Sequence, residues 1–197
     1  GGGGGRGGGG GGRDEGGVTG EVAGRGEKWG GWGGQSGWRE RLMERLNRGW
    51  GWNGGMGGGG DEEQGGSEGR IRIKVNSLTD VAVIEALYRA SQAGARVELV
   101  TRSICTLRPG VPGLSENIEV RSVVGRFLEH SRVFMFEAGG DTSVYLGNAD
   151  LMPRNLDHRI EVVAPVEDRR SKDEISSVFD TLMADNADAW LLDAEGS

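Results

Sequence analysis

Glycine is distributed so unevenly along this chain that it limits where a folded core can form. Thirty-two of the 40 glycines lie in residues 1–70. Glycine loses the most backbone entropy on ordering and brings no side chain to bury, so tracts without a regular period favour disorder. We therefore expect residues 1–69 to be a low-complexity, mostly disordered segment and residues 70–197 to be the folded domain. A domain of that size has room for one modest core.

One stretch within the glycine-rich segment has helical spacing. Trp38, Leu42 and Leu46 fall at positions i, i+4 and i+8, which predicts a helix over residues 38–48. Eleven residues are marginal for an isolated helix. Four further tryptophans fit either a solvated tail or a segment that docks on a partner; they are Trp29, Trp32, Trp50 and Trp52.

The first part of the expected domain has the pattern strand, helix, strand. Alternating apolar and basic residues indicate a half-buried strand: Ile71, Arg72, Ile73, Lys74 and Val75. Helical spacing follows over residues 81–91, where Ser77 and Asp80 resemble a capping box and Gly94 stands just after the end. The next strand is expected over residues 96–101, and so short a crossover favours parallel pairing.

The second part of the domain has further strand patterns and a closing helix. A loop rich in proline and glycine, residues 107–113, follows the second strand, where α/β folds often place ligands. Strands are expected over residues 118–124, 133–136, 144–147 and 159–164. An amphipathic helix is expected over residues 171–184, with Ile175, Val178, Phe179 and Leu182 on one face. Together these patterns predict a single α/β domain with a mixed sheet.

Charge and cysteine usage narrow the functional classes. The net charge of −7 argues against a general nucleic-acid or anionic-membrane binder. The single cysteine, Cys105, has no internal disulfide partner, and we read it as a small packed residue in a chain that fits a reducing compartment such as the cytoplasm. No apolar run approaches the ~20 residues that span a bilayer, and no signal peptide is evident. Because the first residue is glycine rather than methionine, we expect a fragment.

The arginines and one histidine carry the chemical signal. Eight arginines and no lysine lie between Arg96 and Glu161, which suits bidentate recognition of phosphate, although a GC-rich coding sequence would produce the same bias. If the segment is extended, His130 and Arg132 point the same way, so a proton donor and a fixed cation would face one phosphoryl group. A lone histidine is more often structural. A cysteine-based zinc site is excluded, and a site built on His130 and His158 would need carboxylates to complete it, so we assign no residue as a metal ligand.

The spacing of these residues resembles one half-site of the phospholipase D superfamily. The pattern consists of His130, Arg132 two residues later, Glu137 five residues after that, and then Gly147-Asn148-Ala149-Asp150. Arginine here replaces the usual lysine, and glutamate replaces aspartate. Enzymes of that superfamily build one active site from two half-sites, and this chain shows only one.

Longer motifs resemble the C-terminal catalytic domain of the polyphosphate kinase 1 family, over about residues 70–192. They comprise Val75-Asn76-Ser77-Leu78, residues 84–94, residues 107–118 and Gly125 to Arg132. The resemblance implies a phospholipase D-like half-domain that takes part in reversible transfer of the terminal phosphate of ATP to inorganic polyphosphate, with magnesium and a phosphohistidine intermediate. It also implies that Arg102 contacts ATP phosphates and that His130, together with Arg132, contacts nucleotide phosphate. His130 would further donate a proton.

The departures from the family matter as well. No stretch of residues 1–69 resembles the family's dimer domain or the half-domain with the nucleophilic histidine and the magnesium-contacting arginines. We therefore expect no turnover by this chain alone and do not carry dimerisation over. Ser103 stands where glycine is usual and could restrict the loop, while His158 stands where arginine is commoner and is expected to begin a strand.

Two other readings remain open on the sequence. One is a phospholipase D-like phosphodiesterase that dimerises, with His130 as nucleophile. The other is a non-catalytic polyanion-binding or interaction module in which the segment rich in glycine and tryptophan recruits the partner. Four more arginines either line a polyphosphate channel or form surface ion pairs; they are Arg108, Arg126, Arg154 and Arg159.

Overall fold

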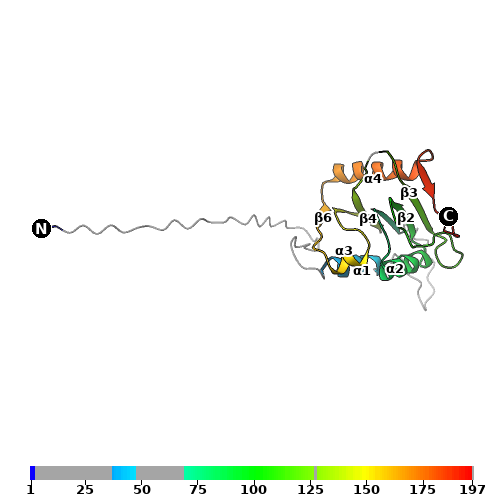
Figure 1. Ribbon diagram of the computed structural model, residues 1–197, viewed down its shortest axis with the longest axis horizontal. Helices are drawn as coiled ribbons and strands as arrows, with labels where there is room; N and C mark the ends of the chain where they lie inside the picture. Colours follow the sequence, from blue (N-terminus) through cyan, green and yellow to red (C-terminus); the bar gives the residue numbers. More distant parts are fainter. Residues whose placement is uncertain (3–36, 48–68, 127, 197) are drawn as a thin grey trace, which may run out of the picture.

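A computed structural model describes residues 1–2, 37–47, 69–126 and 128–196. The described part is a layered α/β domain in which one seven-stranded sheet lies between helices (Figure 1). The strands are β1 (Arg70–Val75), β2 (Arg96–Thr101), β3 (Ile118–Val123), β4 (Arg132–Ala138), β5 (Asp141–Gly147), β6 (Val163–Val166) and β7 (Ala189–Leu191). The helices are α1 (Gly37–Asn47), α2 (Val81–Gln92), α3 (Pro153–Asp157) and α4 (Arg169–Ala184).

The sheet is mixed, as the sequence predicts. Its strand order is β6-β5-β4-β1-β2-β3-β7. The central strands β1, β2 and β3 pair in parallel, whereas β4, β5 and β6 form antiparallel pairs on one side and β7 pairs antiparallel with β3 on the other. The predicted parallel pairing of residues 70–75 with residues 96–101 is confirmed, with Ile71 opposite Val97 and Ile73 opposite Leu99.

Helix α2 begins one turn later than a capping box at Ser77 would place it. Asp80 is the N-cap, and its side chain accepts a hydrogen bond from the backbone N–H of Val83 at 3.1 Å. Ser77 is instead buried in the chain that leaves β1, and its carbonyl accepts from Leu151 N–H at 3.0 Å. At the other end, Gly94 has a φ of 89°, the left-handed conformation that glycine tolerates best.

The prediction of a half-buried first strand is wrong, because both faces of β1 are covered. Arg72 is 2% exposed and Lys74 is 4% exposed, although both alternate with apolar residues. Arg72 lies under α4, where it donates hydrogen bonds to Ser176 and Asp180 and its guanidinium lies 5.4 Å from the centre of the Phe179 ring. The alternation therefore separates two buried environments, one apolar and one built of ion pairs.

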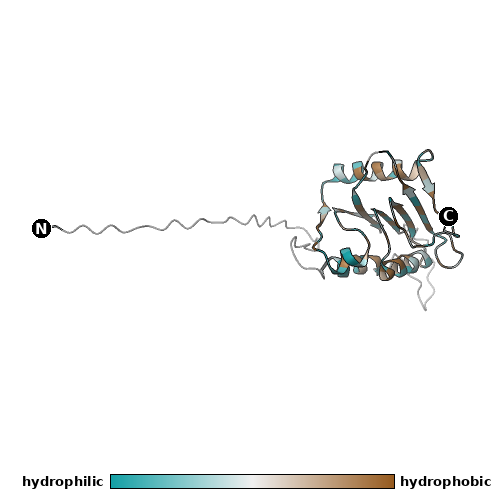
Figure 2. Cartoon of the chain, viewed as in Figure 1, coloured by the Kyte–Doolittle hydropathy of each residue, from teal (hydrophilic) through white to brown (hydrophobic). Residues whose placement is uncertain are grey.

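Two apolar cores lie on the two faces of the sheet, and the brown residues of Figure 2 line the layers on either side. The larger core joins the sheet to α1, α2 and α3, and includes Leu78 and Leu87. The smaller core lies beneath α4 and centres on Met135 and Phe179. Among the described helices, none is long and apolar enough to cross a membrane.

Helix α1 confirms the helical spacing around Trp38 and belongs to the larger core. Leu42 and Leu46 are 1% and 2% exposed, and the Trp38 ring meets Phe134 edge-on at 5.0 Å. Arg39 pairs with Asp80 at 3.1 Å and with Asp157 at 2.7 Å, which ties α1 to the start of α2 and the end of α3. Packing of this kind stabilises a helix that would be marginal alone.

The remaining predictions for residues 1–69 fall largely outside the described residues. The four flanking tryptophans and the glycine tracts of residues 3–36 and 48–68 lie there. The domain boundary between residues 69 and 70 therefore stays a prediction.

The later elements match the predictions in part. The closing helix is confirmed as α4 and begins after the N-cap Asp168, but Val178 is 57% exposed and does not face the core as predicted. Strand β6 begins at Val163 rather than Arg159: Arg159 lines a cavity, and the N–H of Val162 donates to the Asn148 side chain at 2.8 Å before the ladder begins. The short elements α3 and β7 were not expected, since five and three residues are too few to show a period.

A candidate phosphate-binding site

Four chain segments meet at one edge of the sheet and enclose a cavity of about 370 Å³. The parallel strands β1 and β2 end there, β5 ends there, and β4 begins there, so residues distant in sequence come together. Loops beyond the carboxyl ends of parallel strands are the usual ligand sites of α/β folds. The lining residues are Asn76, Ser77, Arg102, Ser103, His130, Arg132, Asp150, Arg154 and Arg159.

Backbone hydrogen bonds hold the cavity floor in place. The carbonyl of Asn76 accepts from the N–H groups of Arg102 and Ser103 at 3.3 and 2.8 Å. Asp150 Oδ1 accepts from the N–H of Asn76 at 2.8 Å. The ends of β1, β2 and β5 are thereby linked directly, so Arg102 projects from a fixed backbone.

Arg132 lies at the centre of the site and bridges Asp150 to His130. Its Nε and Nη2 donate to the two carboxylate oxygens of Asp150 at 3.2 and 3.0 Å. Its Nη1 contacts His130 Nδ1 at 2.6 Å and donates to the His130 carbonyl at 2.7 Å. Arg132 and Asp150 are each 6% exposed, so the ion pair between them is largely shielded from water. Burial raises the pKa of Asp150, but hydrogen bonds from Arg132 and the Asn76 backbone outweigh it and hold the pKa below its usual value.

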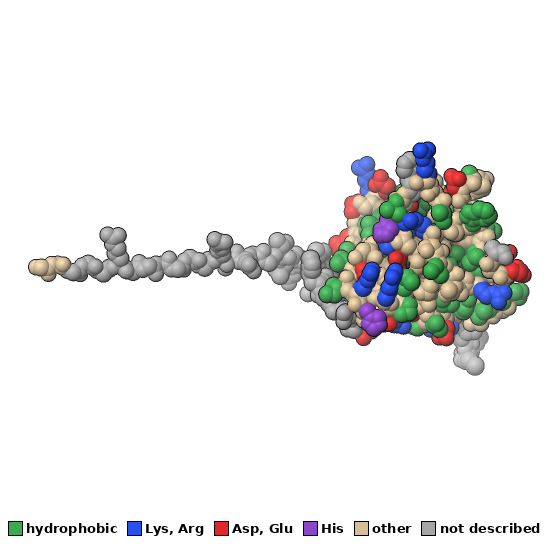
Figure 3. All heavy atoms as spheres, viewed as in Figure 1, with side chains coloured by type: hydrophobic (Ala, Val, Ile, Leu, Met, Phe, Trp, Pro, Cys, Tyr) green, Lys and Arg blue, Asp and Glu red, His purple; other side chains and the backbone are tan. Residues whose placement is uncertain are grey.

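Three other arginines at the cavity have no hydrogen bond or ion pair from their side chains within the described residues. Arg102 follows β2, Arg154 lies in α3, and Arg159 lies in the segment before β6. Basic side chains gather between the two histidines on the face shown in Figure 3. Unpaired guanidinium groups that converge on one cavity provide several donors for phosphate oxygens.

A second ion pair supports the loop that carries His130. Lys74 is buried, and its Nζ donates to Glu129 Oε1 and to the Ser131 carbonyl, both at 3.0 Å. Glu129 Oε1 also accepts from the Ser131 hydroxyl at 2.6 Å and from its N–H at 2.8 Å. The hydrogen bond from the Ser131 hydroxyl is the largest cause that lowers the pKa of Glu129 to about 2.

The structure brings the three predicted site residues, Arg102, His130 and Arg132, to the same cavity. Their chemical roles remain predictions. Glu137, expected in the half-site pattern, does not join them: it lies near the far end of β4, opposite Thr142 of β5. Asp150 is the acidic group at the site, and no role was predicted for it. The only sequence signal for it was the motif Gly147-Asn148-Ala149-Asp150.

Of the four arginines considered for a channel, Arg154 and Arg159 reach the cavity and the other two do not line it. The Arg108 side chain donates from Nε to the Ala194 carbonyl at 2.9 Å, well away from the site. The glycine and proline loop of residues 107–113 runs back toward the opposite edge, where the Gly113 carbonyl accepts from Gln92.

Among the described residues, His158 and Cys105 do not line the cavity. His158 does not begin a strand; it is the C-cap of α3 and donates its backbone N–H to Arg154. Cys105 packs against the larger core, and burial raises the pKa of its thiol, which agrees with a packed residue.

The described residues do not supply a magnesium site. They contain no group of three or more histidine, cysteine, aspartate or glutamate side chains that could hold a metal. Of the described residues that line the cavity, Asp150 alone carries a carboxylate, and both of its oxygens accept hydrogen bonds from Arg132. Asn76 Oδ1 is buried beside the cavity without a hydrogen-bond partner, but a single neutral oxygen among arginines is a poor magnesium ligand set.

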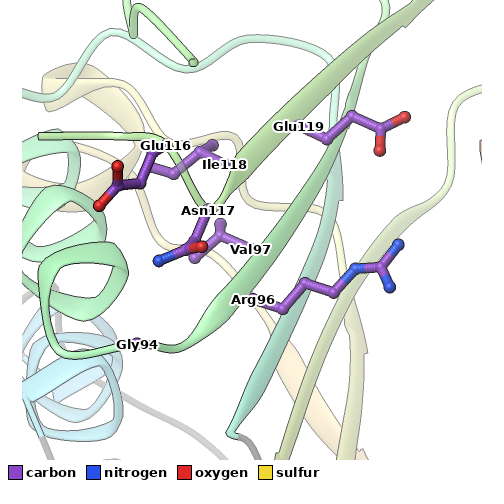
Figure 4. A pocket seen from close by; sticks show the side chains of 7 residues that line it. All are labelled: Gly94, Arg96, Val97, Glu116, Asn117, Ile118 and Glu119. Atoms are coloured by element: carbon purple, nitrogen blue, oxygen red, sulfur yellow. The ribbon is translucent and has the colours of Figure 1, made fainter. Parts of the chain in front are cut away.

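A second hollow, of about 310 Å³, lies at the opposite edge of the sheet (Figure 4). Arg96, Glu116 and Glu119 supply its charges, and in Figure 4 the two carboxylates point away from each other. Arg96 already pairs with Glu98 at 2.9 Å. These mixed and diverging charges do not form a site for an anion.

The fold is that of phospholipase D-like half-domains. A phospholipase D family member from Salmonella typhimurium aligns with a TM-score of 0.54 over 79% of this chain and 90% of its own. The two are 12% identical, so this likeness concerns the fold alone.

More specific similarity identifies the family. Residues 60–197 match the family described as polyphosphate kinase C-terminal domain 2. A polyphosphate kinase from Pseudomonas aeruginosa is 54% identical over 132 residues, which make up 67% of this chain and 19% of the relative. The crystal structure of polyphosphate kinase from Porphyromonas gingivalis aligns with a TM-score of 0.63 and 37% identity, over 80% of this chain and 22% of that one. The chain therefore belongs to the polyphosphate kinase family.

The similarity extends further toward the amino terminus than the expected residues 70–192. A polyphosphate kinase from a Synechocystis species is 47% identical over 159 residues, 81% of this chain and 20% of the relative. A match of that length must reach α1, which agrees with the packing of α1 into the core. The chain spans about a fifth of the length of these relatives.

Proposed function

We propose that this chain forms the phosphate-handling half of a polyphosphate kinase active site, which transfers the terminal phosphoryl group of ATP reversibly to inorganic polyphosphate. The observation that carries the proposal is the convergence, on a cavity that also contains His130, of three arginines whose side chains are unpaired within the described residues. Phosphoryl transfer requires mainly that phosphates be positioned and their charge neutralised. Arg102, Arg154 and Arg159 are suited to both tasks.

The proposed reaction has two balanced steps. A nucleophilic histidine, contributed by a second half-site, attacks the terminal phosphorus of ATP, so that a P–N bond forms, a P–O bond breaks and ADP leaves. A terminal oxygen of polyphosphate then attacks the phosphohistidine, which restores the histidine and lengthens the polymer by one phosphate. His130 donates a hydrogen bond to the leaving oxygen in the first step, and Arg102 binds the nucleotide phosphates.

Arg132 has a different position from the unpaired arginines. Four of its five N–H groups are directed at Asp150 and His130, which leaves one on Nη2 for a phosphate oxygen. Direct phosphate binding by Arg132 is therefore the minor part of its proposed role. Magnesium, which the family implies, has no ligand set among the described residues.

Binding is the first test, and it uses the whole chain because α1 is part of the core. Titration calorimetry with polyphosphate should show binding that weakens as ionic strength increases. Arg102→Gln and Arg159→Gln should each weaken it about tenfold, the effect of losing one charge-assisted hydrogen bond. Arg170→Gln, in the first turn of α4 at the opposite edge, is the matched control. Equal binding by all four proteins would contradict the proposal.

Catalysis is the second test. The chain is assayed with ATP and polyphosphate, alone and mixed with a related polyphosphate kinase that lacks its C-terminal domain 2. We expect turnover only in the mixture, and its loss with His130→Ala. Retained polyphosphate binding without turnover in the mixture would instead favour a non-catalytic polyanion-binding module.

A further inference from the structure

His130 contacts Arg132 through Nδ1, and this contact bears on which nitrogen of the imidazole carries the proton. The distance from Arg132 Nη1 to His130 Nδ1 is 2.6 Å. A guanidinium group has five N–H donors and no acceptor, so the imidazole nitrogen that faces it must accept. In a neutral imidazole, the nitrogen that accepts carries no proton, and the proton then resides on the other nitrogen.

We propose that Arg132 holds neutral His130 in the tautomer with its proton on Nε2, which makes Nε2 the hydrogen-bond donor available to a bound phosphate. Arg132 is thus a positioning residue for His130. The role of this donor in phosphoryl transfer rests on the proposed function. The tautomer itself depends only on the contact between Arg132 and His130.

Asp150 makes the arrangement rigid from the opposite side. Its two oxygens hold Arg132 Nε and Nη2 at 3.2 and 3.0 Å, so the planar guanidinium group cannot rotate without losing both bonds. Asp150 is itself fixed by the backbone N–H of Asn76 at 2.8 Å. The chain of contacts therefore runs from the end of β1 through Asp150 and Arg132 to the ring of His130.

The backbone beside His130 is held independently by the Lys74–Glu129 pair. Lys74 is 4% exposed and reaches Glu129 Oε1 and the Ser131 carbonyl, each at 3.0 Å. Glu129 and Ser131 are the two residues that flank His130 in sequence. Because both are bound, His130 has a fixed backbone on either side although its own side chain is exposed.

The tautomer is measurable by NMR, since the chain has only two histidines. Long-range proton–nitrogen spectra of the ¹⁵N-labelled whole chain are recorded without nucleotide, above the pH range near 6.5 in which histidine ordinarily titrates. His158→Gln assigns the remaining signals to His130. We expect a pyridine-type shift for Nδ1 and a pyrrole-type shift for Nε2, with about a tenfold excess of this tautomer. Averaged shifts, or a proton on Nδ1, would overturn the proposal.

Variants separate the positioning residues from general effects on folding. Arg132→Lys keeps the charge but loses the planar fork, and should bring the two tautomers closer to equal populations in a chain whose amide spectrum stays folded. Glu129→Ala should reduce the tautomer excess less strongly, because Arg132 remains. Glu116→Ala at the opposite edge is the control. A tautomer ratio in Arg132→Lys equal to that of the parent would contradict the role of Arg132.

The outcomes for the tautomer and for the proposed function are independent. A correct tautomer in a chain that fails to restore turnover would count against the kinase assignment only. Turnover with an averaged His130 would count against the tautomer only.

Discussion

Two groups of arginines in this domain differ in how completely their charges are paired. Beneath α4, the Glu98 side chain is 2% exposed and forms ion pairs with Arg70, Arg72 and Arg96 at 2.8, 3.0 and 2.9 Å. At the cavity, Arg102, Arg154 and Arg159 have no side-chain hydrogen bond or ion pair within the described residues. The first group belongs to the folded structure, and the second retains its donors for a ligand. Residue type alone does not distinguish the two groups.

The largest expected effect tests the paired group. Glu98→Ala removes the carboxylate shared by three arginines and leaves the buried Arg72 partly uncompensated. Removing one partner of a buried pair costs about 3–5 kcal/mol, so the free energy of unfolding should fall by about that amount in urea denaturation. The fraction that remains folded should bind polyphosphate like the parent. If Glu98→Ala kept the free energy of unfolding of the parent but bound polyphosphate more weakly, the paired arginines would serve the ligand and not the fold.

The next largest effect is expected in the unpaired group, where a substitution should weaken binding and leave the free energy of unfolding nearly unchanged. Arg102→Gln should weaken polyphosphate binding about tenfold, or ~1.4 kcal/mol, while it changes the free energy of unfolding by less than about 0.5 kcal/mol. Calorimetric titration and urea denaturation on the same preparation measure both quantities. If Arg102→Gln unfolds the chain, the residue has a structural partner and belongs with the first group.

A smaller effect concerns acid stability at the cavity edge. The pKa of Glu129 is about 2 in the folded chain, below its ordinary value of 4.5, and the pKa of Asp150 is also lowered. A carboxylate whose pKa is lower in the folded state contributes stability that is present above its unfolded pKa and lost as pH falls toward its folded pKa. The free energy of unfolding should therefore decrease between about pH 4.5 and about pH 2.

Glu129→Gln separates this contribution from the rest of the acid response. Its free energy of unfolding, measured by urea denaturation across that range, should fall less steeply than that of the parent chain. Glu116→Gln, which removes a carboxylate from the opposite edge, is the control. Identical slopes for Glu129→Gln and the parent would show that the Lys74–Glu129 pair does not contribute.

The smallest effect is expected at the exposed member of the paired group. Arg96 pairs with Glu98, but its side chain is 61% exposed. Exposed ion pairs contribute about 0–1 kcal/mol, so Arg96→Gln should shift the midpoint of urea denaturation only slightly and leave polyphosphate binding unchanged. A loss as large as that of Glu98→Ala would show that the whole group acts as a unit.

Local patterns in the sequence predicted most elements of the fold. The periods of residues 81–91 and 171–184 predicted α2 and α4, and the apolar residues Val97, Leu99 and Val100 predicted β2. The half-buried reading of β1 failed because a period of two shows that two faces differ without showing that one is exposed. Both polar residues of β1 are buried: Arg72 forms an ion pair with Asp180 of α4, and Lys74 forms one with Glu129, next to His130.

The sequence predicted the basic residues of the site, but it did not predict a role for the acidic residue, Asp150. Arg102, His130 and Arg132 came from a family resemblance and from the two-residue spacing of His130 and Arg132. Asp150 was part of the motif Gly147-Asn148-Ala149-Asp150 but was given no role, and its partner Arg132 lies 18 residues away in the sequence. Sequence separation does not predict which carboxylate reaches a buried guanidinium group.

By itself, the sequence determined the α/β class, the order of most elements and the set of residues able to bind phosphate. These follow from local periodicity and from side-chain chemistry, which are properties of short segments. Only the tertiary structure decided which arginines are neutralised, which carboxylate holds Arg132 and which nitrogen of His130 contacts Arg132. Those outcomes depend on contacts between segments far apart in the chain, and strand pairing and helix packing create such contacts only when the whole domain folds.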